Sequence, residues 1–546
     1  MDRGTGGDLL VQVMRDNGAD TAFGVVSVHN LPLVEAVARD LRFVPVRHEA
    51  AAVNAADGHA RANGGLGVAI TSTGTGAGNA AGAMVEALSA GSRVLHVTGQ
   101  IDSAHLGEGR GVIHETRDQL GMLAAVSCHA ATVRSCEDAD RELRTAVERA
   151  RGVPGGPSSV EWPIDLQYVE HPVAAGSAAR SAAPPAPDRG AVRRAAELLR
   201  SARRPVLWAG GGAVRAGDRL RCLAELLRAG IFTSNSGRGT VPEEHELVIG
   251  NFASHPEAEG LLEEADLLLS VGTHFRSNET KHYGLQLPGR HVQIDADPAA
   301  IGRAYPAAVG VPGEADEVLR LLLEQLDESA GGDEDWRSRV VSTKDAVRKK
   351  LRAAIGPQAR ICDALRAALP EESVIARDVT VPSSQWGNRL LDMPRPEVNL
   401  FPVGGGIGQG LATGLGAALA RPEAPTAVLA GDGGLAVHRG ELATLAEQRP
   451  WLVLVVFNDG GYGVLRNMQD HHTGQRAGVD LFTPDFARLA ASFDLPHALV
   501  TRVDSFAEVL DGALARRGPH LVEVDMTALE PAPAPFVPPV HVPGSS

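Results

Sequence analysis

The chain has 546 residues, a formal net charge of −15 at pH 7 and 44% hydrophobic residues. At roughly 150 residues per domain, this length predicts three or four domains, and the negative charge argues against nucleic acid as a partner. No apolar run reaches the roughly 18 residues of a membrane span and the first residues lack a signal-peptide core, so we predict a cytoplasmic protein without membrane contact. The four cysteines show no metal-binding spacing and are expected to be free, mostly buried thiols.

Predicted strands and helices alternate through the first part of the chain. Strands are expected at 21–25, 41–46, 67–71 and 93–98, with one more inside 153–167, and helices at 7–17, 50–63 and 80–90. This alternation is typical of a parallel, doubly wound sheet. The first domain is therefore placed at residues 1–170.

Two further α/β domains are predicted downstream. Residues 171–189 have the Ala, Pro and Ser content of an extended linker. The central domain, 189–326, is expected to have a helix at 191–202, strands at 205–209, 265–272 and 291–298, and a helix at 315–326. The charged stretch 327–350 is expected to cross to the third domain, 356–528, and the Pro-rich tail, 529–546, to pack on the surface or be disordered. The predicted fold class is α/β, with three doubly wound parallel-sheet domains.

The third domain carries two aspartates where predicted strands end. Strand 426–430 stops at Gly431-Asp432-Gly433-Gly434, and strand 451–457 is followed by Asn458-Asp459-Gly460-Gly461. Glycines allow the backbone to approach a phosphate, and the carboxyl ends of parallel strands form the ligand-binding edge of a sheet. Two carboxylates with nearby carbonyls form an oxygen-only site suited to Mg²⁺ that also holds a diphosphate. An ordinary strand-to-helix turn is the alternative interpretation.

The segment 431–466 resembles the thiamine diphosphate signature of the acetolactate synthase and 2-keto acid decarboxylase family, with the spacing of the acetolactate synthase-like group. The resemblance implies thiamine diphosphate and Mg²⁺ as cofactors. It assigns Asp432, Asp459 and Gly461 to the metal, and Gly433, Gly434 and Tyr462 to the cofactor. Asp459 replaces the usual asparagine, which crowds negative charge around the diphosphate.

Residues 47–100 look like the pyrimidine-binding half of these enzymes. The resemblance implies that Glu49 protonates the pyrimidine N1′, which requires a carboxyl whose pKa an apolar setting raises. In the segment 402–420, Ile407 matches the residue under the bend of the cofactor and Gly405 the carbonyl that accepts from its amino group. Because Glu49 and the diphosphate residues lie in different domains, the resemblance implies a homodimer or homotetramer with sites at the subunit interface.

The residues near the predicted substrate favour carboligation. After a 2-keto acid such as pyruvate loses CO₂, the resulting enamine takes either a proton, giving an aldehyde, or a second carbonyl, giving a 2-hydroxy ketone or acid. Pyruvate decarboxylase-like enzymes use an Asp, paired His residues and a Glu at places that look like Val28, His114-Glu115 and Leu465 here. With His114 as the main catalytic acid/base candidate, we predict an acetolactate synthase-like carboligase. A non-oxidative decarboxylase and a catalytically degenerate binding subunit are the alternatives.

Some departures from acetolactate synthase leave the acceptor and FAD open. Ile113 and His114 replace Phe and Gln, and Met468 stands near the place of a Trp, so we expect an acceptor other than, or broader than, pyruvate. The central domain looks like the family's FAD-binding domain, but His274 replaces its Arg, and FAD binding is left open. Four other histidines could approach the pocket and are interpreted individually as surface or structural residues: His29, His438, His471 and His472.

Overall fold

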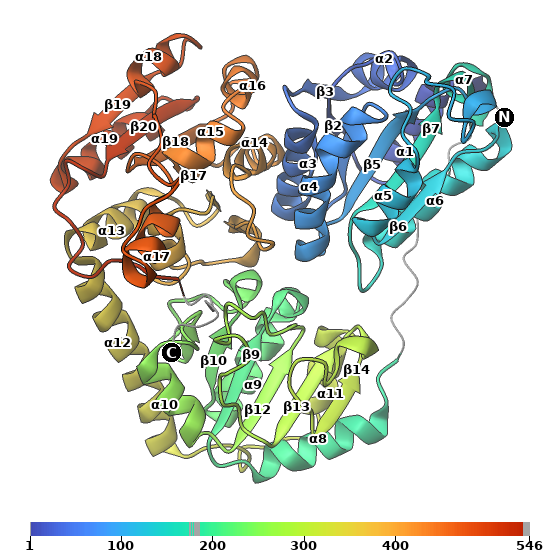
Figure 1. The fold of residues 1–546 in the computed structure, drawn as a ribbon. Helices are drawn as coiled ribbons and strands as arrows, with labels where there is room; N and C mark the ends of the chain where they lie inside the picture. The colour runs from blue at the N-terminus through green and yellow to red at the C-terminus, as the bar shows by residue number, and fades with distance from the viewer. Residues whose placement is uncertain (1, 174–175, 177, 179–185, 539–546) are drawn as a thin grey trace.

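Three six-stranded parallel sheets organise the chain (Figure 1). The structure is a computed structural model and describes residues 2–173, 176, 178 and 186–538. The predicted α/β fold class with three doubly wound parallel sheets is confirmed. Among the described residues, no helix is both long and apolar enough to cross a membrane.

The N-terminal sheet is buried between its helices, and its strands follow the order β3-β2-β4-β5-β7-β6. Every residue of its β4 and β5 is buried, including the polar His96, Thr98 and Gln100 of β5. The strands are β2 (Thr21–Gly24), β3 (Arg42–Pro45), β4 (Gly67–Thr71), β5 (Val94–Gln100), β6 (His129–Thr132) and β7 (Ser158–Pro163). The helices are α1 (Gly6–Asp16), α2 (Leu31–Asp40), α3 (Glu49–Asn63), α4 (Thr75–Ala90), α5 (Gln119–Ala125), α6 (Cys136–Arg151) and α7 (Ile164–Tyr168).

The central sheet has the strand order β11-β10-β9-β12-β13-β14. The strands are β9 (Pro205–Ala209), β10 (Gly230–Thr233), β11 (Val248–Gly250), β12 (Leu267–Val271), β13 (His291–Asp295) and β14 (Val309–Pro312). The helices are α8 (Arg189–Ser201), α9 (Gly217–Leu227), α10 (Pro256–Glu264) and α11 (Ala315–Leu323).

The C-terminal sheet has the order β16-β15-β17-β18-β20-β19 and places β17 and β18 side by side at its centre. The strands are β15 (Val374–Arg377), β16 (Asn399–Leu400), β17 (Thr426–Gly431), β18 (Leu452–Asn458), β19 (His497–Val500) and β20 (His520–Asp525). The helices are α12 (Glu334–Ile355), α13 (Ala359–Ala368), α14 (Gly410–Ala420), α15 (Asp432–Val437), α16 (Glu441–Gln448), α17 (Gly463–His472), α18 (Phe486–Ala491) and α19 (Phe506–Ala515).

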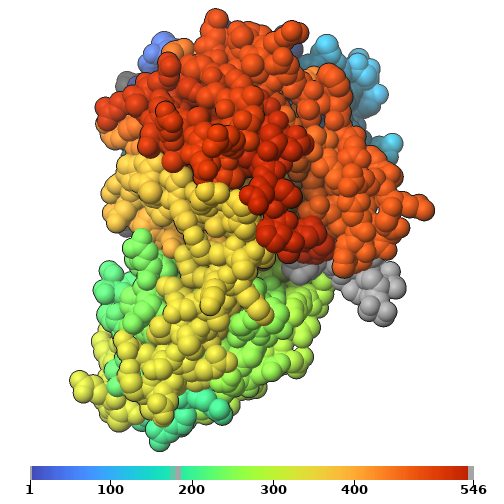
Figure 2. Space-filling model, turned by 90° about the vertical axis from the view of Figure 1, so that its left-hand side faces the viewer, coloured from blue at the N-terminus to red at the C-terminus, as the bar shows by residue number. Residues whose placement is uncertain are grey.

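Helix α12 was not predicted, because the charged residues of 327–350 obscured its apolar stripe. It has 22 residues and buries Trp336, Val340, Val347 and Leu351 at helical spacing. The Trp336 indole N–H donates to the Pro205 carbonyl at 3.0 Å, which docks the helix on the central domain. Figure 2 shows this yellow segment running from the C-terminal domain over the green central domain.

Three smaller predictions also differ from the structure. The helix expected from residue 80 begins at Thr75, because the glycine-rich turn before it already has helical geometry. The linker expected at 171–189 begins with a strand, β8 (His171–Val173), which pairs antiparallel with β1 (Asp2–Gly4). Most of the remaining linker, and the tail after residue 538, lie outside the described residues. The cysteines are not mostly buried: Cys362 is buried, Cys136 is partly exposed, and Cys128 and Cys222 are exposed.

The N-terminal and C-terminal domains of one chain meet where α3 crosses α14. This contact depends on glycines, because a Cβ at Gly58 would lie 1.9 Å from the Thr413 carbonyl oxygen, and one at Gly416 would lie 1.9 Å from that of Ala55. Such distances are too short for any side chain, so the two backbones approach as closely as a helix pair can. The crossing holds the edges of the two sheets together (Figure 1).

We expect the Gly58→Ala substitution to destabilise the full chain by about 1–3 kcal/mol, because the new methyl group meets backbone atoms that cannot move aside. Scanning calorimetry should show a lower Tm. The matched control is Gly512→Ala in α19, where a Cβ would meet open space and alanine favours the helix. Equal Tm values for the two variants would contradict this account of the crossing.

Candidate active site

Asp432 and Asp459 lie next to each other at the carboxyl ends of β17 and β18. The Asp459 backbone N–H donates to Asp432 Oδ1 at 3.3 Å. Asp432 Oδ2 and Asp459 Oδ1 are buried without a hydrogen-bond partner. Burial raises the pKa of Asp432, and burial together with the Asp432 charge raises the pKa of Asp459 to about 6. Two adjacent buried carboxylates with free oxygens fit a divalent cation.

Backbone groups lie beside these carboxylates. A Cβ at Gly433 would lie 2.7 Å from the Gly461 carbonyl oxygen and 2.8 Å from the Tyr462 ring, so the turn after β18 rests on the start of α15. Within the described ranges, no group of three or more His, Cys, Asp or Glu side chains could hold a metal ion. A Mg²⁺ ion at this place would therefore need carbonyl and diphosphate oxygens besides the two carboxylates.

Arg466 offsets part of the charge that Asp459 adds. Its Nη1 donates to the Asp459 carbonyl at 2.9 Å and lies 3.6 Å from Asp459 Oδ1, while its Nε donates to Asp480 at 2.7 Å. The guanidinium thus offsets part of the charge of the second carboxylate from the side of α17. The sequence analysis did not single out Arg466, although it ends the segment that carries the cofactor resemblance.

Asp378 is a buried carboxylate that the sequence analysis missed. It follows β15 and accepts backbone N–H groups from Gly408 and Gly410 at 3.1 Å each. Burial raises the pKa of Asp378 to about 6. A Cβ at Gly434 would lie 3.3 Å from its Oδ2, so Asp378 joins the loop before α14 to the start of α15. Its position at a strand end was the signal that could have found it.

The loop before α14 carries the two residues predicted to shape the cofactor. Gly405 has a φ of +82°, in the left-handed region that favours glycine. Ile407 is 38% exposed in the single chain. His438 Nδ1 lies 2.9 Å from the Gly408 carbonyl oxygen, so His438 supports this loop and is not a surface histidine.

Glu49 is the first residue of α3 and lies at the carboxyl edge of the N-terminal sheet. Its Oε2 accepts from the Asn79 side-chain N–H at 3.0 Å, and a Cβ at Gly76 would lie 3.0 Å from its Oε1. Next to it, the Arg47 backbone N–H donates to Glu441 Oε1 at 2.9 Å, across to the C-terminal domain. Among the described residues, Glu49 itself has no hydrogen bond or ion pair with that domain.

His114 lies against a second histidine, His29, which the sequence analysis interpreted as a surface or structural residue. Their Nδ1 atoms are 3.3 Å apart. His29 is 5% exposed, and burial together with the nearby His114 lowers the pKa of His29. By contrast, His471 and His472 stack on each other at the end of α17 and contact neither histidine of this pair.

Large apolar side chains are exposed on the segments that carry both groups of predicted site residues. On the loops of the N-terminal domain they are Val26, Val28 and Ile113. In the C-terminal domain they are Ile407 and Phe482 on loops, Val437 in α15 and Leu465 in α17, and Phe482 is 96% exposed. Single exposed apolar residues are ordinary, but several on these segments are typical of a surface that another chain covers.

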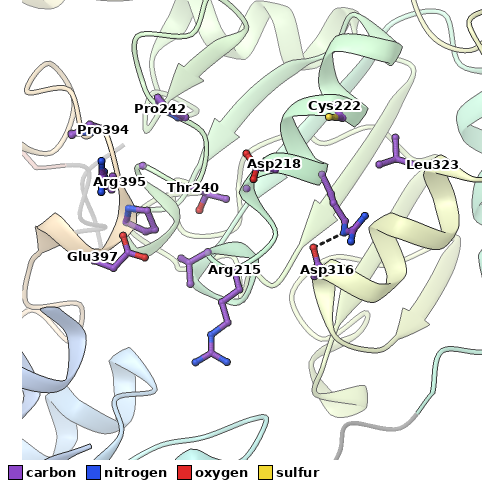
Figure 3. Close-up of a pocket in the computed structure, with 15 residues that line it drawn as sticks. Arg215, Asp218, Cys222, Thr240, Pro242, Asp316, Leu323, Pro394, Arg395 and Glu397 are labelled. Carbon is purple, nitrogen blue, oxygen red and sulfur yellow. Dashed lines mark hydrogen bonds and ion pairs between the residues drawn. The ribbon is translucent and has the colours of Figure 1, made fainter. Parts of the chain in front are cut away.

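The central domain borders a cavity of about 570 Å³, and none of the predicted site residues lines it (Figure 3). It lies around the start of α9 and the segment 394–397. The glycine run of this domain is explained by packing, since a Cβ at Gly210 would lie 2.1 Å from the Gly272 carbonyl oxygen. Asp295 at the end of β13 keeps one buried oxygen without a partner, which would suit a ligand. The packing of the glycine run gives no support to FAD binding, whereas the free Asp295 oxygen is compatible with a ligand. FAD binding therefore stays a prediction.

Comparison with known proteins shows the family of the chain. Three thiamine pyrophosphate enzyme models match the chain: the N-terminal TPP binding domain at residues 4–122, the central domain at 192–322 and the C-terminal TPP binding domain at 381–524. The chain therefore belongs to the thiamine pyrophosphate enzymes. Within them it is a member of the group that contains the acetolactate synthases and 2-keto acid decarboxylases.

Similar proteins include both a decarboxylase and acetolactate synthases. A probable 2-ketoarginine decarboxylase of Pseudomonas aeruginosa is 34% identical, over 95% of this chain and 94% of the relative. A probable acetolactate synthase large subunit of Methanocaldococcus jannaschii is 29% identical, over 98% and 93%. The large subunit of acetolactate synthase isozyme 1 of Escherichia coli is 26% identical, over 98% and 96%.

Proposed function

We propose that two copies of this chain form thiamine diphosphate sites between the N-terminal domain of one protomer and the C-terminal domain of the other, and decarboxylate a 2-keto acid there. The observation that carries the proposal is the pair of buried carboxylates, Asp432 and Asp459, each with a buried oxygen that has no hydrogen-bond partner. The exposed apolar side chains around both half sites support a shared interface. A homodimer is the smallest assembly that provides it, and a homotetramer would contain two such pairs.

Each predicted residue has a definite task in this site. Asp432 and Asp459, with the Gly461 carbonyl, would hold Mg²⁺, and Gly433, Gly434 and Tyr462 would border the diphosphate. Ile407 and the Gly405 carbonyl would hold the bent form of the cofactor, and Glu49 would protonate its pyrimidine N1′. When bound, thiamine diphosphate would supply a nucleophilic carbon that adds to the ketone and a cationic ring that takes up the electron pair released with CO₂.

We propose non-oxidative decarboxylation to an aldehyde as the outcome. His29 contacts His114, the main acid/base candidate, and can hold its ring in place, and the 34% identical relative is named as a probable 2-ketoarginine decarboxylase. Carboligation is the second candidate, because Leu465 stands where decarboxylases have a glutamate and the other relatives are acetolactate synthases.

The test is a product assay with thiamine diphosphate and Mg²⁺. Pyruvate and 2-ketoarginine are the first substrates, each alone and with a second carbonyl compound, and CO₂ and organic products are followed by mass spectrometry. We expect CO₂ with an aldehyde. A hydroxy ketone as the main product would establish carboligation instead, and the lack of CO₂ from every 2-keto acid tried would contradict both.

A further inference from the structure

Two histidines from distant loops meet at the carboxyl edge of the N-terminal sheet. His29 follows β2 and His114 follows β5, and their ring centroids are 5.2 Å apart. The backbone carbonyl group of each histidine packs against a neighbouring segment. Gln167 donates its side-chain N–H to the His29 carbonyl at 2.9 Å, and a Cβ at Gly74 would lie 2.1 Å from the His114 carbonyl oxygen.

His114 has a φ of +66°, a left-handed conformation that is uncommon for residues other than glycine. Its carboxylate neighbour, Glu115, accepts the backbone N–H groups of Gly109, Gly111 and Val112, which closes the loop around this conformation. The loop thus presents the His114 ring to His29. Backbone strain of this kind is concentrated at functional sites.

The pair lies beside the predicted position of the cofactor. Gly74, which contacts His114, precedes α4, and Gly76, which contacts Glu49, is in the first turn of the same helix. The contact of Gly76 with Glu49 and the contact of Gly74 with His114 therefore lie within one helical turn of each other. Val28 and Ile113, directly before the two histidines, are 59% and 67% exposed and form an apolar rim.

Contact between two Nδ1 atoms requires one hydrogen between them. If His29 carries that hydrogen, His114 accepts it at Nδ1 and must carry its own hydrogen at Nε2. The contact therefore forces the two neutral rings into opposite tautomers. When the pair takes up one more proton, both Nε2 atoms become donors, and the shared hydrogen remains between the rings.

We propose that His29 is a positioning residue that holds His114 with its Nε2–H directed at the substrate, and that His114 gives this proton to the carbon from which CO₂ has left. The proposal rests on the proposed function. The bond between the carbonyl carbon and the carboxylate breaks, a C–H bond forms with the proton from Nε2, and water returns a proton to the pair. The sum is R–CO–COO⁻ + H⁺ → R–CHO + CO₂, which needs no oxidant or reductant.

The surroundings of the pair contain few other charges. Burial and the nearby His114 lower the pKa of His29, and no carboxylate contributes to that shift. From β2 and its following turn, the Ser27 hydroxyl accepts the His29 backbone N–H at 3.2 Å. On the loop of His114, Glu115 is engaged by backbone amides. From α7 and α5, Gln167 and Gln119 face this edge with neutral amides.

The first test measures hydrogen–deuterium exchange at the imidazole Cε1 atoms by mass spectrometry across a pH series, on the full chain without cofactor. His114→Gln should raise the exchange midpoint of His29, because it removes the neighbouring charge that lowers the pKa of His29. An unchanged His29 midpoint in His114→Gln would overturn the shared-proton pair.

The second test separates proton delivery from decarboxylation. With a 2-keto acid that the wild type accepts, His29→Phe should lower aldehyde formation by about 10²-fold or more. CO₂ release coupled to hexacyanoferrate, an oxidant that removes the need for the proton, should fall less than about 5-fold, which also shows that the variant is folded and loaded. The matched control is His105→Asn, on the same loop and without contact to the pair.

The outcomes are distinct. Equal losses of aldehyde and of oxidant-coupled CO₂ release in His29→Phe, or aldehyde formation as in His105→Asn, would overturn the role of His29 while leaving the proposed function intact. If the wild type releases no CO₂ from any 2-keto acid, even with the oxidant, the proposed function falls and this role falls with it.

Discussion

Glu49→Gln should slow exchange of the thiamine C2 proton by about 10²–10⁴-fold, the range that a positioned acid or base contributes. Glutamine keeps the shape of the side chain and its contacts with Asn79 and Gly76 but cannot protonate the pyrimidine. Cofactor binding should therefore persist. The measurement is proton–deuterium exchange at C2 by NMR after acid quench of the loaded protein.

The control for this experiment is Glu35→Gln on α2, an exposed glutamate of the same domain. It should exchange at the wild-type rate. If Glu49→Gln also exchanges at that rate with full cofactor occupancy, the acid that activates the pyrimidine must be another residue.

Asp432→Ala should weaken Mg²⁺-dependent binding of thiamine diphosphate by about 100-fold or more, because it removes a buried ligand oxygen that no other group replaces. Isothermal titration calorimetry with Mg²⁺ and with EDTA measures the effect. Binding that is equal in the variant and the wild type, in both solutions, would place the metal elsewhere.

The neighbouring substitution, Asp459→Asn, should behave differently. Burial and the charge of Asp432 raise the pKa of Asp459 to about 6, from 3.8, so at pH 7 the ionised group destabilises the folded, metal-free protein. The destabilisation begins as the pH rises above 3.8, the pKa of Asp459 in the unfolded chain. It is complete once the pH exceeds about 6, the pKa of Asp459 in the folded protein. The asparagine should therefore raise the Tm of the metal-free protein at pH 7 and leave it nearly unchanged at pH 4, while Mg²⁺ binding is retained.

Strand ends could be located from sequence because buried parallel strands have apolar runs that stop abruptly. That logic brought Asp432 and Asp459 to one place from separate segments, and the structure shows their contact at 3.3 Å. Applied to β15, the same logic would have found Asp378. The sequence could not show His29 beside His114, since their contact depends on two loop conformations, one of them left-handed.

Helix α12 illustrates a different limit. Its apolar residues recur at helical spacing, but charged residues outnumber them, and only docking against the central domain turns that narrow stripe into a buried face. The role of Arg466 was also hidden in the sequence, because its ion pair with Asp459 depends on where α17 starts. The sequence therefore did not reveal these contacts between elements.

The glycine crossing of α3 and α14 has a geometric consequence for the assembly. Because neither helix has room to slide on the other, each protomer presents its acid-bearing edge and its metal-bearing edge in one fixed relation. In the proposed homodimer, twofold pairing of such protomers would bury identical surfaces on both partners, so reaction centres would arise two at a time, related by the symmetry axis. A dimer with a single complete centre would require the helices to separate.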